Sequence, residues 1–158
     1  LYMTKKWDVR FTKLAREVAT WSKDPSTQIG AVIVNDERRV LATGYNGFPK
    51  GIADTPERYD NKEVKYETVI HAEMNAIYNA TYSGTSLKDS TIYVWGLPTC
   101  NDCARGIIQV GVKRVVMATD GPIPEKWVAS FSKSLNLFVE AGVATEFLQD
   151  LTVPELHK

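Results

Sequence analysis

The fold is decided by the stretch TIYVWGLPTCNDCARGIIQVGVKRVVMA, which occupies residues 91–118. Residues 91–95 and 114–118 are rich in β-branched and aromatic side chains, which predicts two short strands. Between them, residues 103–110 place their apolar side chains on one face of a helix, and Gly111 follows as its stop signal. A strand, a helix and a strand in this order favour neighbouring parallel strands, so the stretch predicts an α/β protein.

The same patterns continue on both sides of this stretch. The apolar spacing predicts further helices over residues 6–22, 68–82 and 125–141 and further strands over residues 30–34, 40–45 and 143–148, the first two strands forming a hairpin. Together these elements predict a five-stranded mixed sheet with helices on both faces. We expect one domain over residues 1–158, with a core from about residue 7 to residue 148 and a tail over residues 149–158.

Residues 46–66 interrupt this regular order. They hold two glycines and two prolines, many charges and few apolar side chains. A loop of this length in a compact domain is usually functional or disordered. We expect a short helical piece at most, and a segment too polar to join the core.

The composition narrows the classes of partner. The 158 residues carry 19 basic and 19 acidic side chains, so the formal net charge is zero. This argues against binding of a long nucleic acid through the overall field of the protein. The sequence shows no secretory signal and no run of about 18 apolar residues that could span a membrane. We therefore expect a cytoplasmic protein without a membrane partner.

Four side chains in two motifs point to a metal site. His71 and Glu73 stand two residues apart, and Cys100 and Cys103 have the spacing of a zinc knuckle. The chain has only two cysteines and two histidines, and the second histidine, His157, belongs to the predicted tail. Three ligands, His71, Cys100 and Cys103, leave a fourth position for water, which is typical of catalytic rather than structural zinc. Zinc lowers the pKa of bound water from about 15.7 toward about 7.

Glu73 then becomes a candidate proton carrier rather than a ligand. It lies at the start of a predicted helix, beside the expected water, and can take its proton and pass it to a leaving amine. Other interpretations remain open for each residue. Cys100 and Cys103 could form a redox pair, and His71 and Glu73 could be ordinary residues of a first helical turn.

The motif H-x-E followed by P…C-x-x-C resembles that of the zinc-dependent cytidine and deoxycytidylate deaminases. Further similarity to the deoxycytidylate (dCMP) deaminases lies in residues 22–31, 44–49, 71–77 and 100–111, and the resemblance covers roughly residues 7–148. It implies the three-layer fold of that family and a single catalytic zinc ion. One departure is Thr99, which separates Pro98 from Cys100 where the family has Pro-Cys, and which alters the loop beside the base.

The resemblance also implies a reaction and a substrate. Water attacks C4 of the cytosine ring of dCMP, Glu73 protonates N3 and then the departing ammonia, and the product is dUMP. The backbone of Ala72 is expected to bond the edge of the base, and Asn46 the sugar or the base. Candidates for the phosphate are Lys23, Ser26 and Thr27. Asn46 could equally be a plain turn residue, and the other three could belong to a solvated loop.

By the same resemblance, residues 46–66 take part in an allosteric site that dCTP activates and dTTP inhibits. The candidates for this site are Tyr45, Asn46, Gly47, Lys50 and Arg58. A bound triphosphate is expected to bring Mg²⁺. Related enzymes form homohexamers, so Tyr78 and Tyr82 are expected at an interface or in the core. The alternatives are a deaminase of another cytosine nucleoside or nucleotide, and a zinc-binding domain without catalysis.

Overall fold

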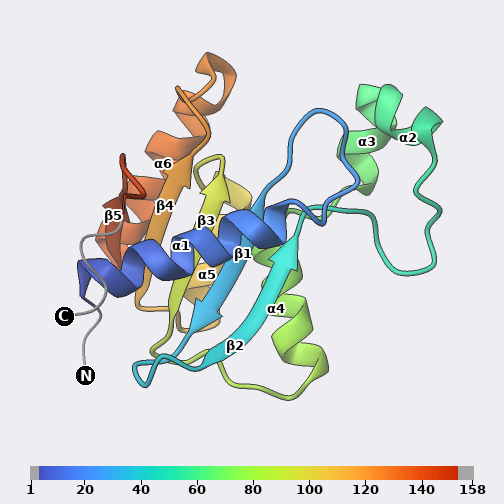
Figure 1. Cartoon of the computed structure of the whole chain (residues 1–158). Coiled ribbons are helices and arrows are strands. Elements are labelled where there is room, and N and C mark those ends of the chain that lie inside the picture. The colour runs from blue at the N-terminus through green and yellow to red at the C-terminus, as the bar shows by residue number, and fades with distance from the viewer. Residues whose placement is uncertain (1–3, 153–158) are drawn as a thin grey trace.

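The computed structural model describes residues 4–152 around one five-stranded sheet (Figure 1). The strands are β1 (Gly30–Val34), β2 (Val40–Tyr45), β3 (Thr91–Gly96), β4 (Arg114–Thr119) and β5 (Ala144–Phe147), in the spatial order β2-β1-β3-β4-β5. Strand β1 pairs antiparallel with β2 and β3, whereas β3, β4 and β5 are parallel. The prediction of a five-stranded mixed sheet is therefore confirmed.

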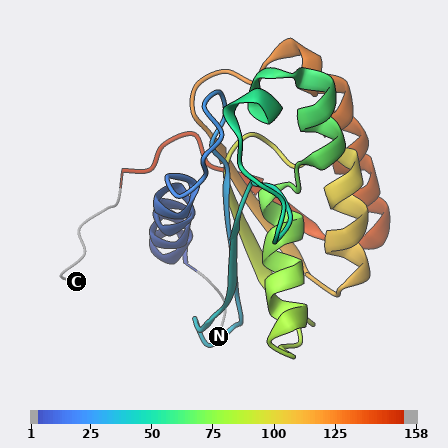
Figure 2. The same cartoon turned by 90° about the vertical axis from the view of Figure 1, so that its right-hand side faces the viewer.

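Helices cover both faces of the sheet, as predicted (Figure 2). Helix α1 (Lys5–Ala19) lies alone on one face, and α4 (Ala72–Tyr82), α5 (Asn101–Gln109) and α6 (Glu125–Ala141) lie side by side on the other. Each face buries its own apolar cluster. Val32 and Val34 of β1 pack toward α1, while Ala31 and Ile33 pack toward α4, so every residue of this strand is buried.

Two glycines allow the helices to lie unusually close to the sheet. A Cβ atom added at Gly30 would lie 1.9 Å from the carbonyl oxygen of Ala15 in α1. A Cβ atom added at Gly44 would lie 2.3 Å from the backbone nitrogen of Ala76 in α4. Because α4 carries the His-x-Glu motif at its first turn, the glycine at position 44 helps to set the height of that motif above the sheet.

The segment after β2 is more ordered than predicted. It forms two short helices, α2 (Pro56–Asp60) and α3 (Lys62–Thr68), where we expected a short helical piece at most. Their starts are capped: the Thr55 hydroxyl accepts from the backbone of Arg58, and the Asn61 amide oxygen accepts from the backbone of Val64. Tyr59 is buried and stacks on Phe48 with ring centroids 4.4 Å apart. The expectation that this segment contributes nothing to a core is therefore wrong.

Some predicted boundaries also shift. Helix α4 begins at Ala72 rather than at residue 68, because Ile70 is extended and forms a two-bond bridge with Gly47. Helix α5 begins at Asn101, with Cys100 as its N-cap. Gln149 to Thr152 form neither helix nor strand. The rest of the predicted tail, including His157, lies outside the described residues. Over residues 4–152 we find no helix both long and apolar enough to cross a membrane.

Candidate metal centre and active site

Two helix starts meet at the edge of the sheet where β3 ends. His71 is the N-cap of α4 and Cys100 is the N-cap of α5, which directly follows β3. The loop over residues 97–99 therefore leads to Cys100 and Cys103 at the start of α5, next to His71 and Glu73 at the start of α4. The dipoles of both helices favour negative charge here, which suits thiolates.

The atoms of the three predicted ligands are about as far apart as the ligands of one tetrahedral metal ion. His71 Nδ1 is 3.3 Å from Cys100 Sγ and 3.4 Å from Cys103 Sγ, and all three ligand atoms lie within 4.8 Å of one another. With bonds of about 2.3 Å to sulfur and about 2.0 Å to nitrogen, a tetrahedral zinc ion separates these atoms by about 3.6 Å. The residues present therefore fit zinc, and three ligands leave one coordination position for a substrate or water.

Hydrogen bonding within the ligand set creates thiolate character. Cys103 hydrogen-bonds to Cys100 and lowers the pKa of the Cys100 thiol to about 4, with a further contribution from His71. The same bond, together with burial, raises the pKa of Cys103. Cys100 in turn raises the pKa of His71 to about 9. Zinc must displace such protons when it binds.

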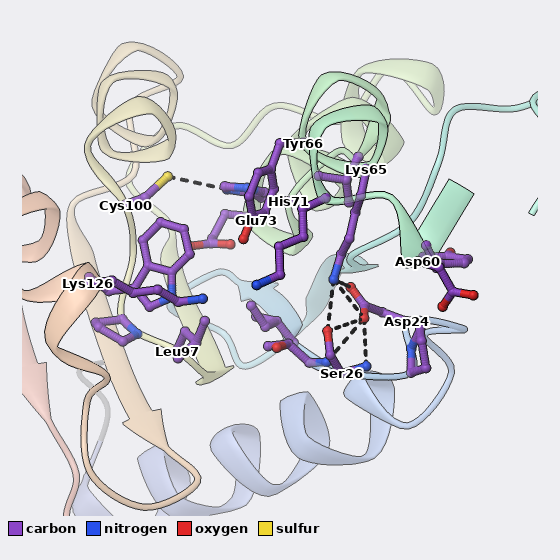
Figure 3. Close-up of a pocket in the computed structure, with 18 residues that line it drawn as sticks. Asp24, Ser26, Asp60, Lys65, Tyr66, His71, Glu73, Leu97, Cys100 and Lys126 are labelled. Atoms are coloured by element: carbon purple, nitrogen blue, oxygen red, sulfur yellow. Dashed lines mark hydrogen bonds and ion pairs between the residues drawn. The ribbon is translucent and has the colours of Figure 1, made fainter. Parts of the chain in front are cut away.

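Glu73 lies beside the three candidate ligands but is not one of them (Figure 3). Its side chain is 3 % exposed, and it does not belong to the cluster of three ligands. Burial raises the pKa of its carboxyl above the usual value, while the nearby charge of His71 opposes that rise. A carboxyl group whose pKa is moved toward neutrality can both accept and give back a proton during a reaction.

These residues form one end of a pocket of about 460 Å³ (Figure 3). Its walls come from the loop after α1, from α2 and α3, from the Leu97–Cys100 loop and from the start of α6. Besides His71, Glu73 and Cys100, the polar and aromatic lining residues are Asp24, Ser26, Thr27, Tyr59, Asp60, Lys62, Lys65, Tyr66, Lys126 and Trp127. A pocket of this volume suits a small molecule with one aromatic ring.

A buried ion pair joins two of these walls. Lys65 Nζ of α3 lies 2.8 Å from Asp24 Oδ2, and the two side chains are only 13 % and 3 % exposed. Asp24 also accepts hydrogen bonds from the Ser26 hydroxyl and from the backbone of Ser26 and Thr27. Burial works to raise the pKa of Asp24, but Lys65 and these hydrogen bonds outweigh it and lower the pKa from 3.8.

The predicted substrate contacts are only partly brought together. Ser26 and Thr27 line the pocket. Lys23 does not line it: its side chain is 71 % exposed and pairs with Asp54. Ala72 is fully buried and does not line the pocket. Its backbone N–H lies in the first turn of α4, where an N–H group has no hydrogen-bond acceptor within the helix.

Asn46 lies outside the pocket lining as well, with 5 % exposure. Its amide oxygen accepts from the backbone of Ile29 at 2.9 Å, and its amide nitrogen donates to the carbonyl of Thr27 at 2.9 Å. Both polar atoms of the Asn46 amide are therefore bonded to the chain itself. Asn46 instead fixes the loop that carries Ser26 and Thr27.

The predicted effector residues make their contacts with several different parts of the chain. Tyr45 is exposed and packs its ring edge against Trp21, and Lys50 lies 4.6 Å from the ring of Tyr82 in α4. Gly47 bridges to Ile70, and Arg58 donates to the carbonyl of Ala53. Tyr78 and Tyr82 are 53 % and 84 % exposed, so they are not core residues.

Sequence reasoning missed Lys65, Lys126 and Trp127. The position of Lys126 and Trp127 had a usable signal, because they follow β4 and the carboxyl ends of neighbouring parallel strands meet at the same edge. Lys65 had none, since its contact with Asp24 spans 41 positions of the sequence.

Comparison with known proteins gives a consistent family. Residues 5–119 match the model of the cytidine and deoxycytidylate deaminase zinc-binding region. The chain is 37 % identical to an uncharacterized deaminase of Aliivibrio fischeri over 147 residues, which are 92 % of this chain and 96 % of that protein. It is 43 % identical to human deoxycytidylate deaminase over 120 residues, which are 73 % of this chain and 66 % of the human protein.

Solved structures agree on the fold. A dCMP deaminase from the cyanophage S-TIM5, crystallised with dCMP and dUMP, superposes with a TM-score of 0.75 at 24 % identity, covering 93 % of this chain and all of the other. At that identity the superposition shows the fold alone. The family match spans more than two thirds of the chain and includes His71, Glu73, Cys100 and Cys103. The chain therefore belongs to the cytidine and deoxycytidylate deaminase family.

Proposed function

We propose that this protein deaminates dCMP hydrolytically to dUMP and ammonia. The observation that carries the proposal is the arrangement of His71, Cys100 and Cys103 as a three-ligand metal centre with the buried Glu73 beside it, inside a pocket of nucleotide size. The identity to human deoxycytidylate deaminase supports dCMP as the substrate, although the chain spans only about two thirds of that protein.

The chain's own residues supply binding and proton transfer. Zinc, when held by the three ligands, supplies the Lewis acidity that makes water a nucleophile near neutral pH. Glu73 accepts one proton of that water and passes it to N3 of the ring as the C4–O bond forms. It then takes the second proton from the new C4 hydroxyl group and delivers it to the amine, so that the C4–N bond breaks and ammonia leaves. The backbone of Ala72 and of the Leu97–Cys100 loop borders the edge of the base.

A direct assay tests this proposal. We expect the zinc-loaded protein to release ammonia from dCMP, and Glu73→Gln to retain its zinc while losing at least about a hundredfold in kcat, because general acid–base catalysis contributes about 10²–10⁴-fold. Zinc is counted by mass spectrometry under native conditions. Full activity in Glu73→Gln, or no ammonia from dCMP with the wild type, would contradict the proposal.

A second candidate is the same reaction on another cytosine nucleoside or nucleotide. The reaction end of the pocket serves both candidates, because the cytosine ring is the same and only the sugar or its phosphates differ. Parallel assays with deoxycytidine, cytidine and dCTP separate these substrates. A zinc-binding domain without catalysis is disfavoured by the buried carboxylate of Glu73, which lies beside a set of only three ligands within residues 4–152.

We further propose regulation of the assembled enzyme, with dCTP activating and dTTP inhibiting. Exposed Tyr45, Tyr78 and Tyr82, together with Lys50 over Tyr82, give a surface of aromatic rings and a cation that suits a subunit interface or a nucleotide with Mg²⁺. The expected assembly is a homohexamer in the cytoplasm, where thiols stay reduced for zinc. Hyperbolic dCMP kinetics that ignore both effectors would refute the regulation.

A further inference from the structure

The pocket beside Glu73 contains three lysines that are not equivalent. Lys62 and Lys65 belong to α3, and Lys126 belongs to the first turn of α6. A nucleotide whose base reaches Glu73 must place its phosphate toward one of them, because a phosphate in a pocket needs a charge-assisted donor. The inference that follows rests on the proposed function and concerns which lysine distinguishes a nucleotide from a nucleoside.

Lys65 is already committed to the protein. Its ammonium group lies 3.0 Å and 2.8 Å from the two carboxylate oxygens of Asp24 and donates to the Ser26 hydroxyl at 2.9 Å. An ammonium group has three protons, so this set of acceptors uses its full capacity. Withdrawing Lys65 toward a phosphate would leave the almost fully buried carboxylate of Asp24 without its counter-charge, which is costly.

The negative charges of the pocket are distributed unevenly. Apart from Glu73, the lining carboxylates are Asp24 and Asp60, and both lie on the side of Lys65 (Figure 3). Lys62 follows Asp60 by two residues at the start of α3. A phosphate on that side would meet two carboxylates. Lys126 extends from the opposite wall with its amine directed into the pocket. Neither Lys62 nor Lys126 forms an ion pair with any residue between 4 and 152, so the two lysines differ in the carboxylates that lie near them.

The helix that carries Lys126 is hydrogen-bonded to the residues on either side of the ligand Cys100. Ser130 and Ser134 lie one and two turns further along α6, on the same face. The Ser130 hydroxyl accepts from the backbone of Asn101 at 3.0 Å, and the Ser134 hydroxyl donates to the carbonyl of Thr99 at 2.8 Å. The helix that carries Lys126 is thus bonded to both residues that flank Cys100. Its N-terminal dipole also favours an anion at this end.

We propose that Lys126 binds the 5′-phosphate of the substrate and makes the pocket selective for a nucleoside monophosphate over a nucleoside. The neighbouring Trp127, whose ring centroid is 5.3 Å from the Lys126 amine, limits where this amine can point. The Thr27 hydroxyl, which also lines the pocket, makes no hydrogen bond within the described part of the chain and is available as a second donor. Lys65, in contrast, is a positioning residue that holds Ser26 and Thr27 in place.

The test compares Lys126→Gln with Lys62→Gln and with the control Lys133→Gln, an exposed lysine of the same helix outside the pocket lining. Steady-state kinetics are measured on dCMP and on deoxycytidine. Lys126→Gln is expected to lower kcat/KM for dCMP by about ten- to a hundredfold, the usual effect of losing a hydrogen bond to a charged group, and to change that for deoxycytidine much less. Lys126→Arg should restore most of the dCMP activity.

Binding of the product separates this inference from the proposed function. Calorimetry with dUMP and with deoxyuridine needs no turnover, and Lys126→Gln should erase the preference of the wild type for dUMP. Equal losses for dCMP and deoxycytidine, or a selective loss in Lys62→Gln instead, would overturn the role of Lys126. A wild type that binds dUMP tightly through Lys126 but releases no ammonia from dCMP would refute the reaction and leave the phosphate site standing.

Discussion

The ion pair between Asp24 and Lys65 provides the sharpest test of how the pocket is held together. Replacing Lys65 with Met keeps the length of the side chain and removes its charge. Breaking a buried pair by removing one partner costs about 3–5 kcal/mol. Because Asp24 keeps hydrogen bonds from Ser26 and Thr27, we expect the lower end of this range, about 3 kcal/mol. For a chain of this size that corresponds to a fall in Tm of about 6–12 °C.

A double-mutant cycle isolates the pair itself. Unfolding free energies are measured for the wild type, Asp24→Asn, Lys65→Met and the double variant, all with zinc bound. We expect a coupling of at least about 1 kcal/mol, because both charges are removed together only in the double variant. The pair of Lys113 and Asp36 is a matched control, with side chains 43 % and 44 % exposed, and its coupling should stay below about 1 kcal/mol.

The functional consequence of the same change can be measured in parallel. Without Lys65, α3 loses its anchor to the loop that carries Ser26 and Thr27, so KM for dCMP should rise together with KM for deoxycytidine. Hydrogen exchange should report faster opening of α3 while β1 and β3 keep their protection. Additive unfolding energies in the cycle, or unchanged exchange in α3, would refute the view that this pair holds the pocket wall.

Three further outcomes follow from other contacts. Gly44→Ala should destabilise the fold by about 1–3 kcal/mol and lower activity, because the added Cβ atom would meet the backbone of α4. Gly47→Ala is the control: a Cβ atom added there would have no atom within 4 Å, so the free energy of unfolding should be nearly unchanged. Thr99→Val removes a fully buried hydroxyl that has no hydrogen-bond partner within residues 4–152, so Tm should hold or rise. A fall in kcat would show that this hydroxyl acts on Glu73, and an unchanged kcat would exclude that role. The folded-state pKa of Asp24 lies below 3.8, so its contribution to stability is present above about pH 4 and is lost as the pH falls through the folded pKa. The difference in unfolding free energy between the wild type and Asp24→Asn should therefore shrink only below about pH 4. Acid titration followed by circular dichroism measures this difference.

Sequence patterns captured the parts of this protein that local chemistry controls. The strands and the long helices follow from periodicity, and all five strands lie within two residues of their predicted bounds. The ligand set His71, Cys100 and Cys103 followed from counting the available donors, and the three atoms do converge in the structure. Glu73 could be separated from the ligands because it stands two residues from His71, so that only one of the two is expected to bind the same ion.

Sequence patterns gave little guidance where residues distant in the sequence come together. We expected Asn46 to contact the sugar or the base; in the structure its amide is bonded to Thr27 and Ile29, because β2 ends against the loop that follows α1. Lys23 was a candidate for the phosphate because it lies in the same loop as Ser26 and Thr27. In the folded chain Lys23 turns to solvent beside Asp54, and the cation that reaches Ser26 comes from α3.

The sequence alone thus predicted the fold class, the candidate metal ligands and a candidate proton carrier, since each depends on short spacings within one strand, one helix or one turn. Only the tertiary structure decided which lysines face the pocket and which of them is paired with a carboxylate. That outcome depends on how far each lysine lies from Asp24 and Asp60. The lysines belong to α3 and α6, and the positions of these helices are set by packing rather than by local pattern. Burial makes the choice decisive, because a charge with 3 % exposure must keep its partner, whereas an exposed lysine can exchange water for a phosphate.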